Sequence, residues 1–313
     1  MEYRRLGKTD IEISTVALGC WPIAGITSPG VDDENSLATI RACFDLGINH
    51  LDTAYVYGRL GESERRIAKA LGPRRREMVV ATKVGLHWAS DGSLVRDASP
   101  ATLRRHAEES LRRLETDCVD LLYLHAPDPK VPVAESAGAI KELLAEGKTR
   151  SVGVSNFTVA ELDEFAAVCP IAACQPPYNM LQRQIETDVL PWCRARGVSV
   201  LVYEPLAKGL LTGKFRPDHV FSETDWRRKA PLFQGDAWHS SLALVERLRP
   251  IAADLGRSLA QVVIRWTIDQ PGITAALCGA KTPVQIAETA ASAGWEFPPE
   301  ARQRIEEALA VAQ

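Results

Sequence analysis

The chain has 313 residues, which is enough for one large domain or two ordinary ones. Its content of 46% hydrophobic and 25% charged residues is ordinary for a folded globular protein and excludes wholesale disorder. A net charge of −3 gives no reason to expect a nucleic-acid or membrane-surface partner, and no apolar run is long enough to span a bilayer.

The N-terminus and the cysteines both favour a cytoplasmic location. The run Met1-Glu2-Tyr3-Arg4-Arg5 lacks the apolar core of a signal peptide. The seven cysteines are scattered, odd in number and free of any C-x-x-C pair, which favours reduced thiols over disulfides or a zinc site. We therefore expect a cytoplasmic protein without a metal centre.

In chain order, the pattern begins with a hairpin and then alternates strands with helices. Residues 3–16 alternate around Gly7-Lys8-Thr9-Asp10, which predicts the hairpin, and residues 16–19 form a short apolar strand. A loop rich in Pro and Gly runs through Gly30, and a helix begins at Asp32-Asp33-Glu34. Further strands are predicted at 50–54, 78–83, 119–125, 150–155, 172–178, 199–203 and 273–278. Helices are predicted at 62–71, 99–114, 159–168, 187–196, 241–255 and 259–270, with others ending at 144 and beginning at 283 and 298.

The segment 205–239 breaks this alternation. It is long and irregular, and it contains Trp226, Phe233 and Trp238. A structureless segment of such length in a compact domain is usually a functional lid or a binding loop.

The repeated strand and helix pattern predicts an α/β fold. The eight strands are apolar runs rather than alternating ones, which favours burial on both faces and hence a parallel sheet. Eight such units predict a closed (β/α)8 TIM barrel, with a doubly wound open sheet as the alternative. No internal linker is visible, so we expect residues 1–313 to form one barrel domain.

Polar residues gather at the carboxyl ends of these apolar strands, where barrel enzymes place their chemistry. They are Asp52 and Tyr57, Lys83, His125, Ser155 with Asn156, Gln175, Tyr203 and Gly279. Each has an alternative reading: a strand-end polar residue is usually a solvated loop start, Lys83 and Asp52 can form a structural ion pair, and His125 can be a core histidine. The combination favours a shared pocket.

The side chains at these ends suggest a reaction. A phenol is a poor proton donor at neutral pH, but a neighbouring ammonium lowers its pKa, and a carboxylate holds that ammonium in place. An imidazole can direct a carbonyl oxygen. Such a set can protonate a carbonyl while hydride comes from a nicotinamide cofactor, because no side chain donates hydride. A phosphate-binding isomerase is poorly supported, since it needs a Gly-rich loop and a Glu base, for which Glu204 is the only loose candidate.

Several passages resemble the aldo-keto reductase family, in order and over nearly the whole chain. They are Gly47-Ile48-Asn49-His50-Leu51-Asp52-Thr53-Ala54, Tyr57-Gly58, Gly61-Glu62-Ser63-Glu64, Ala81-Thr82-Lys83, Leu122-Tyr123-Leu124-His125, the run from Gly147 to Phe157, Gln175-Pro176-Pro177-Tyr178-Asn179, the run from Gly209 to Lys214, and Gly279-Ala280-Lys281-Thr282-Pro283. The resemblance implies a TIM barrel with an N-terminal β-hairpin cap, extra C-terminal helices and NAD(P)H bound without a Rossmann fold.

The resemblance also implies roles for individual residues. Asp52, Tyr57, Lys83 and His125 would be the catalytic tetrad, with Tyr57 as the general acid. The cofactor set would comprise Ser155, Asn156 and Gln175 on the nicotinamide carboxamide, Tyr203 on its ring, Leu206, Gly209 and Leu211 over the pyrophosphate, Gly279 at the last strand end, and Lys281, Thr282, Gln285 and Glu288 around the adenosine. Lys281 favours NADP(H) over NAD(H), because a cation can pair with the 2′-phosphate. Thr289 departs from the family pattern, in which many relatives carry Asn.

We therefore predict an NADPH-dependent oxidoreductase that reversibly reduces an aldehyde or ketone, such as a sugar or another small carbonyl compound, to the alcohol. The alternative is a cofactor-binding regulatory subunit on the same fold with little turnover. Trp21, Tyr55 and Trp88, together with the aromatics of 205–239, are the candidate substrate wall. Nothing in the sequence specifies the substrate or an oligomeric interface.

Overall fold

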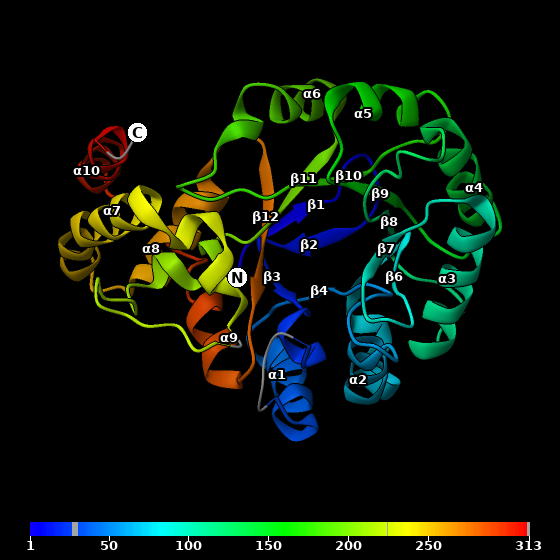
Figure 1. Ribbon diagram of the computed structural model, residues 1–313, viewed down its shortest axis with the longest axis horizontal. Coiled ribbons are helices and arrows are strands. Elements are labelled where there is room, and N and C mark those ends of the chain that lie inside the picture. Colours follow the sequence, from blue (N-terminus) through cyan, green and yellow to red (C-terminus); the bar gives the residue numbers. More distant parts are fainter. Residues whose placement is uncertain (27–30, 224, 312–313) are drawn as a thin grey trace.

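The fold is a closed barrel of eight parallel strands, shown by a computed structural model that describes residues 1–26, 31–223 and 225–311 (Figure 1). Around the barrel the order is β3 (Val16–Gly19), β4 (His50–Asp52), β5 (Val79–Val84), β8 (Leu121–Leu124), β9 (Val152–Ser155), β10 (Ala173–Gln175), β11 (Ser199–Tyr203) and β12 (Ile273–Gly279). The last strand pairs in parallel with the first, which closes the sheet. The barrel prediction is confirmed, and the open-sheet alternative is wrong.

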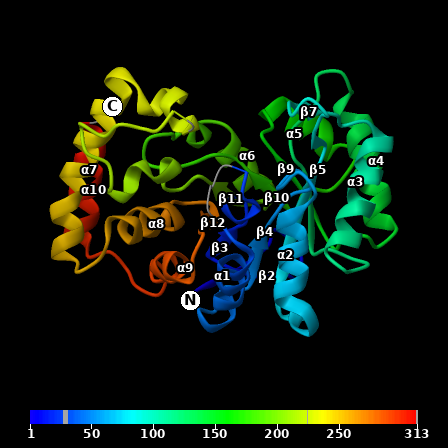
Figure 2. The ribbon, with the colours of Figure 1, turned by 60° about the horizontal axis from the view of Figure 1, so that its bottom comes forward.

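Helices surround the strands. Those that follow the strands are α1 (Asp33–Asp45), α2 (Glu62–Leu71), α3 (Pro100–Arg113), α4 (Val133–Ala145), α5 (Val159–Ala166), α6 (Val189–Arg196), α8 (Leu259–Asp269) and α9 (Pro283–Ala290). Two additional helices, α7 (Gly235–Asp254) and α10 (Pro299–Ala310), pack side by side at one edge of the ring (Figures 1 and 2). None of the described helices is both long and apolar enough to cross a membrane.

Side chains fill the barrel interior, so the barrel is a packed core. The interior cluster includes alanines from several strands and the large ring of Tyr123. Gly153 on β9 makes room for that ring, because a Cβ on Gly153 would lie 2.3 Å from Cε1 of Tyr123. The lower end of the interior is closed by Leu6, Ile11 and Ile13.

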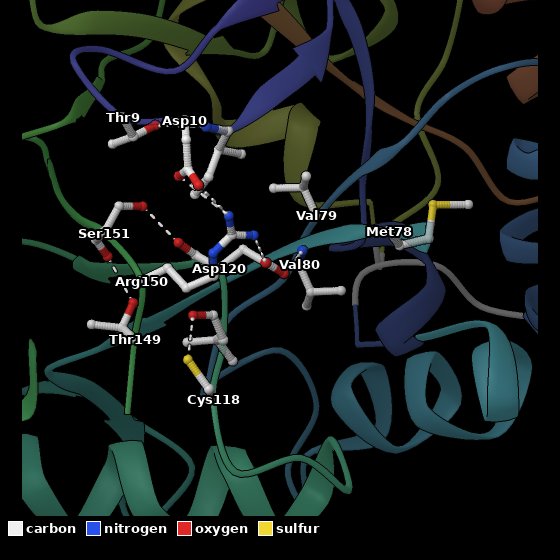
Figure 3. A network of polar contacts seen from close by, with 12 residues as sticks. Thr9, Asp10, Met78, Val79, Val80, Cys118, Asp120, Thr149, Arg150 and Ser151 are labelled. Carbon is white, nitrogen blue, oxygen red and sulfur yellow. Dashed lines mark hydrogen bonds and ion pairs between the residues drawn. The ribbon is translucent and has the colours of Figure 1, made fainter. Parts of the chain in front are cut away.

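Those three residues belong to the N-terminal hairpin of β1 (Tyr3–Arg5) and β2 (Glu12–Ser14), whose strands pair antiparallel. Charged side chains hold the hairpin to the strand starts (Figure 3). Arg150 donates to Asp120 at 2.9 Å and to Asp10 in the hairpin loop at 3.3 Å. Because the hairpin occupies the bottom, the chemistry is left to the carboxyl ends of the strands.

Some predicted elements differ from those observed. The strand expected at 172–178 ends at Gln175, because Pro176 and Pro177 have no N–H for the ladder. Between β5 and α3 an unpredicted antiparallel hairpin is formed by β6 (Leu86–Trp88) and β7 (Leu94–Arg96). These strands are too short to give a periodic signal.

The segment 205–239 is more ordered than expected. It contains the short 3-10 helices η4 (Ala207–Thr212), η5 (Trp226–Lys229) and η6 (Pro231–Phe233), and α7 begins within it at Gly235 rather than at 241. The start of α7 escaped prediction because no side chain caps it. Phe233 and Trp238 are buried with Phe215 in an aromatic cluster, which anchors the segment.

Candidate active site

Lys83, at the end of β5, is the centre of the site. Its ammonium donates to Asp52 Oδ1 at 2.5 Å, to the carbonyl oxygen of Thr53 at 2.9 Å and to Tyr57 Oη at 3.1 Å. A lysine ammonium has three N–H donors, so every donor is used. The side chains of Lys83 and Asp52 are only 1% and 3% exposed, so the ion pair is shielded from water.

The surroundings of Lys83 favour its charged form. Burial alone would lower the pKa of Lys83, but the carboxylate of Asp52 and the hydroxyl of Tyr57 outweigh burial and raise it. The ammonium is therefore a fixed positive charge beside the phenol at neutral pH.

Tyr57 remains a protonated phenol. Burial raises its pKa above the usual value, Asp52 raises it further, and the nearby charge of Lys83 only partly opposes them. The Lys83 ammonium does lower the pKa of Tyr57, as expected, but burial has the larger effect, so the net shift is upward. The hydroxyl is a donor throughout the neutral range.

His125 follows β8 and faces Tyr57. The two ring centroids are 6.0 Å apart with an interplanar angle of 73°. Burial, aided by the positive charges of Lys83 and Arg96, lowers the pKa of His125 well below its usual value, so the imidazole is neutral. Its Nδ1 is buried and has no hydrogen-bond partner among the described residues.

A hydrogen bond joins this group to the next strand ends. Gln175, at the end of β10, donates from Nε2 to Asp52 Oδ2 at 2.7 Å. The backbone oxygen of Gln175 accepts from the Ser155 hydroxyl at 2.8 Å. Four strands thus contribute to one network, from Lys83 through Asp52 and Gln175 to Ser155.

Asn156 extends the network towards solvent. Its amide nitrogen donates to the backbone oxygen of His125 at 3.0 Å and to Ser155 Oγ at 3.1 Å. Its oxygen accepts from the Tyr203 hydroxyl at 2.8 Å. Asn156 is exposed and has a φ of 62°, a conformation that non-glycine residues adopt mainly where function or local bonding requires it.

The loop after β11 also has unusual backbone geometry. Glu204, Ala207 and Lys208 all have positive φ, with values of 56°, 46° and 59°. The amides of Gly209 and Leu211 both donate to the oxygen of Leu206, at 2.9 and 3.2 Å, so this part of η4 is a closed turn. Such accumulated strain is typical of a ligand-clamping segment.

Lys214 was not among the predicted site residues, although it ends the Gly209–Lys214 motif. Its Nζ lies over this turn, since a Cβ on Gly209 would be 3.0 Å from it. Burial and the positive charges of Arg227 and Lys281 lower the pKa of Lys214. Lys214, Arg227 and Lys281 are therefore close enough for electrostatic repulsion. Among the described residues, Asp225 is the one acid that raises the pKa of Lys214, and it is already paired with Arg227. A cluster of this charge suits an anionic ligand.

The start of α9 holds the predicted adenosine residues. The amide of Lys281 donates to Gln285 Oε1 at 2.8 Å, and the amide of Gln285 donates to the Thr282 hydroxyl at 3.3 Å. The Lys281 side chain forms no ion pair with any residue that the structure describes. Glu288 is exposed on the same helix, whereas Thr289 is buried and its hydroxyl donates to its own helix.

Comparisons with known proteins identify the family of the chain. The sequence model of the Aldo/keto reductase family matches residues 15–310. The chain belongs to this family. The aldo-keto reductase YhdN of Bacillus subtilis is 40% identical over 308 residues, covering 97% of this chain and 92% of that protein.

Two further relatives show the range of the family. An NADH-specific methylglyoxal reductase of Escherichia coli is 32% identical and covers 92% of each chain. The solved structure of a glycerol dehydrogenase from Gluconobacter oxydans has a TM-score of 0.92 and 39% identity, and covers 99% of this chain and 95% of its own. This aldo-keto reductase is therefore an oxidoreductase of carbonyl and alcohol groups that uses a nicotinamide cofactor.

The predicted substrate wall is only partly assembled around Tyr57 of the reductase. Trp21 meets the Tyr57 ring edge-on with centroids 5.0 Å apart. Trp88 packs in the same apolar cluster as Tyr57 and donates from Nε1 to the oxygen of Val56 at 2.9 Å. Tyr55 turns towards α3 instead, where its hydroxyl donates to Glu109 at 2.6 Å.

The aromatics of the long segment do not form a common wall. Phe233 and Trp238 are buried in the cluster described above, and Trp226 is exposed beneath the ammonium of Lys208. Arg96 on β7 was missed by sequence reasoning, because nothing marks the hairpin that brings it near His125.

Proposed function

We propose that this reductase reduces an aldehyde or ketone with NADPH, reversibly, and that Tyr57 is the general acid. The observation that carries the proposal is the use of all three Lys83 donors, one of them on the Tyr57 hydroxyl. A phenol held by a buried ammonium is equipped to release its proton into a reacting group.

Several features fit a nicotinamide dinucleotide. Lys214, Arg227 and Lys281 form a positive cluster suited to phosphates, and Asn156 is already oriented by Ser155 and Tyr203. We propose that the cofactor set of the sequence analysis, with Lys214 added, holds the dinucleotide. When bound, the nicotinamide supplies the hydride that no side chain can provide.

Side chains of this protein supply the proton and hold the groups that take part in its transfer. Tyr57 donates its hydroxyl proton to the carbonyl oxygen, and Lys83 stabilises the negative charge that develops on the phenol oxygen. Asp52 holds Lys83 in position through the buried ion pair. His125, kept neutral by burial and nearby cations, directs the carbonyl oxygen by a hydrogen bond without competing as an acid.

The preference for NADPH rests on Lys281. Its ammonium has no ion-pair partner in the described part of the chain and lies close enough to Lys214 to affect the pKa of that lysine. A 2′-phosphate would provide the missing counter-charge. The NADH-specific relative shows that members of the family differ in this choice.

We also propose that residues 1–313 act as one barrel domain. The pairing of β12 with β3 and the family match over 15–310 support this.

Fluorescence titrations with NADPH and NADH separately, followed by absorbance assays over a panel of carbonyl compounds, test the proposal. We expect tighter binding of NADPH and turnover of at least one compound. Tight binding without turnover over a broad panel would favour the regulatory alternative, and failure to bind either dinucleotide would contradict the assignment.

A further inference from the structure

A cavity lies behind the loop that carries Tyr57. It has a volume of about 110 Å³ and is bounded by the 55–59 loop, the β6–β7 hairpin and α3. A single buried water needs roughly 10–15 Å³, so the cavity has room for a larger polar group. Its lining is basic and aromatic, and the residues that matter here are Arg59, His87, Trp88, Arg105, His106 and Arg113.

We call this space the rear cavity. The guanidinium groups around it differ in whether a carboxylate neutralises them. Arg113 is paired with Glu64 at 3.2 Å and Glu109 at 3.5 Å. Arg59 and Arg105 form no ion pair with any carboxylate in the described ranges. The residues lining the rear cavity include no acid, so no carboxylate of the lining neutralises Arg59 or Arg105, both of which are exposed; Arg105 also donates to the Thr102 hydroxyl at 3.3 Å.

His106, in the wall of the rear cavity, has a buried donor without a partner among the described residues. Its side chain is 0% exposed, and its Nδ1 accepts from the amide of Gly85 at 3.3 Å. A ring nitrogen that accepts a hydrogen bond cannot also carry the N–H proton of the neutral imidazole. The proton of His106 is therefore on Nε2. Nε2 is buried and has no partner among the described residues, which is a rare state for a polar atom.

The neighbouring rings hold that donor in place. Tyr55 stacks on His106 with centroids 3.8 Å apart, and the ring of His87 meets it edge-on at 5.4 Å. Burial, Arg105 and His87 lower the pKa of His106 to about 3, so the ring stays neutral and its tautomer is fixed. His87 adds a buried Nδ1 that is also without a partner in the part of the chain described.

We infer that the rear cavity binds a phosphate-sized oxyanion through the guanidiniums of Arg59 and Arg105 and the Nε2–H of His106. Guanidinium groups match the geometry of phosphate oxygens, and the neutral imidazole contributes a directed donor from within. The inference does not depend on the proposed function, because none of these three residues belongs to the tetrad or to the cofactor set.

The rear cavity borders the substrate wall. Trp88 lines it, packs in the cluster that contains Tyr57, and carries the Arg59 guanidinium 5.4 Å from its ring centroid. An anion held by Arg59 would therefore also fix the position of Trp88.

Titration with inorganic phosphate at constant ionic strength, with chloride as the reference salt, tests the inference. The readout is the imidazole NMR signals of His106, assigned by comparison with His106→Gln. We expect a saturable shift in the wild type and at least tenfold weaker binding in Arg105→Gln and in Arg59→Gln. Arg112→Gln, which removes an exposed arginine of the same helix outside the rear cavity, should bind as the wild type does.

Two outcomes would overturn the inference. One is the absence of any saturable change at His106. The other is binding that survives in both arginine variants but is lost in Lys281→Met, which would place the phosphate in the cationic cluster near α9.

Parallel titrations with glycerol phosphate and with acetate identify the source of the anion. Stronger binding of the phosphate monoester would indicate a phosphorylated metabolite, and stronger binding of inorganic phosphate would indicate the free ion. Either result supports the site, whereas preference for acetate over both phosphates would contradict a phosphate-shaped site.

Discussion

The side-chain nitrogen of Gln175 donates a hydrogen bond of 2.7 Å to Oδ2 of Asp52, from the sixth barrel strand to the second. A carboxylate only accepts, so this contact fixes which end of the Gln175 amide faces Asp52. The amide oxygen of Gln175 makes no part of this contact, and in the proposed function it faces the cofactor. One carboxylate thus orients both Lys83 and Gln175, and a change at Asp52 should disturb both.

Replacing Tyr57 with Phe should lower kcat by about 10²–10⁴-fold, the usual contribution of a positioned general acid. The ring and its contact with Trp21 would remain, so the Kd for NADPH should stay within about twofold of the wild type, well below the tenfold that corresponds to 1.4 kcal/mol. Steady-state assays and fluorescence titration check the two quantities. Unchanged kcat in this variant would rule out Tyr57 as the acid.

Carbonyl reduction should be insensitive to pH near neutrality and decline only in the alkaline range. The phenol must be protonated to act as an acid, and burial holds the pKa of Tyr57 above its ordinary value of 10.0. In Lys83→Met the opposing positive charge is absent, so the decline should move to still higher pH while kcat falls. Profiles of kcat against pH for both proteins provide the check, and a decline through pH 7 in the wild type would contradict it.

Asp52→Asn should destabilise the fold, because it leaves the Lys83 ammonium buried without its counter-charge. Breaking one partner of a buried ion pair costs roughly 3–5 kcal/mol. The matched control is Asp10→Asn, whose carboxylate is 87% exposed beside Arg150 and should leave the unfolding midpoint nearly unchanged. Urea unfolding at neutral pH measures both, and equal midpoints for the two variants would refute the prediction.

Lys281→Met should weaken NADPH binding about tenfold, equivalent to about 1.4 kcal/mol, and leave NADH binding unchanged. The reason is that only NADPH carries the 2′-phosphate. Lys130→Met, at an exposed lysine in the loop before α4, is the control for loss of one positive charge. If the binding of NADPH and of NADH weakened equally, Lys281 would contact a group that the two dinucleotides share.

Two glycines should respond in opposite directions to substitution by Ala. At Gly153 the new Cβ would lie 2.3 Å from the Tyr123 ring, and such overpacking costs about 1–3 kcal/mol. At Gly138, inside α4, a Cβ meets no atom within 4 Å, and Ala favours the helix by up to about 1 kcal/mol. Thermal unfolding compares them, and a stabilised Gly153→Ala would mean that the barrel interior is looser than described.

The sequence predicted the barrel well because the patterns of the individual helices and strands agreed with their regular alternation along the chain. The helix at 62–71 and the strand at 199–203 have the expected bounds, since an amphipathic pattern defines the helix and a short run rich in apolar residues defines the strand. The ends of the strands also predicted which polar groups would meet, including the contact between Lys83 and Asp52. Parallel strands necessarily bring their carboxyl ends to one rim.

Other features depend on contacts that no local pattern contains. The direction of Tyr55 is set by Glu109 and His106 on α3, more than fifty positions away in the sequence. The direction of the Tyr57 pKa shift depends on how deeply the phenol is buried relative to Lys83, which follows from the packing of the whole rim. Neither the direction of the Tyr55 side chain nor the direction of the Tyr57 pKa shift can be predicted from residue types and spacing alone.

The closure of the barrel has a consequence for the synthesis of the protein. Val16 of β3 pairs with Ala276 of β12, which is synthesised much later than β3. Both edges of the partly made sheet therefore stay unpaired through most of translation, and exposed strand edges invite pairing with other chains. The nascent chain should depend on chaperones until β12 emerges, and a ribosome stalled before residue 273 should expose an aggregation-prone intermediate.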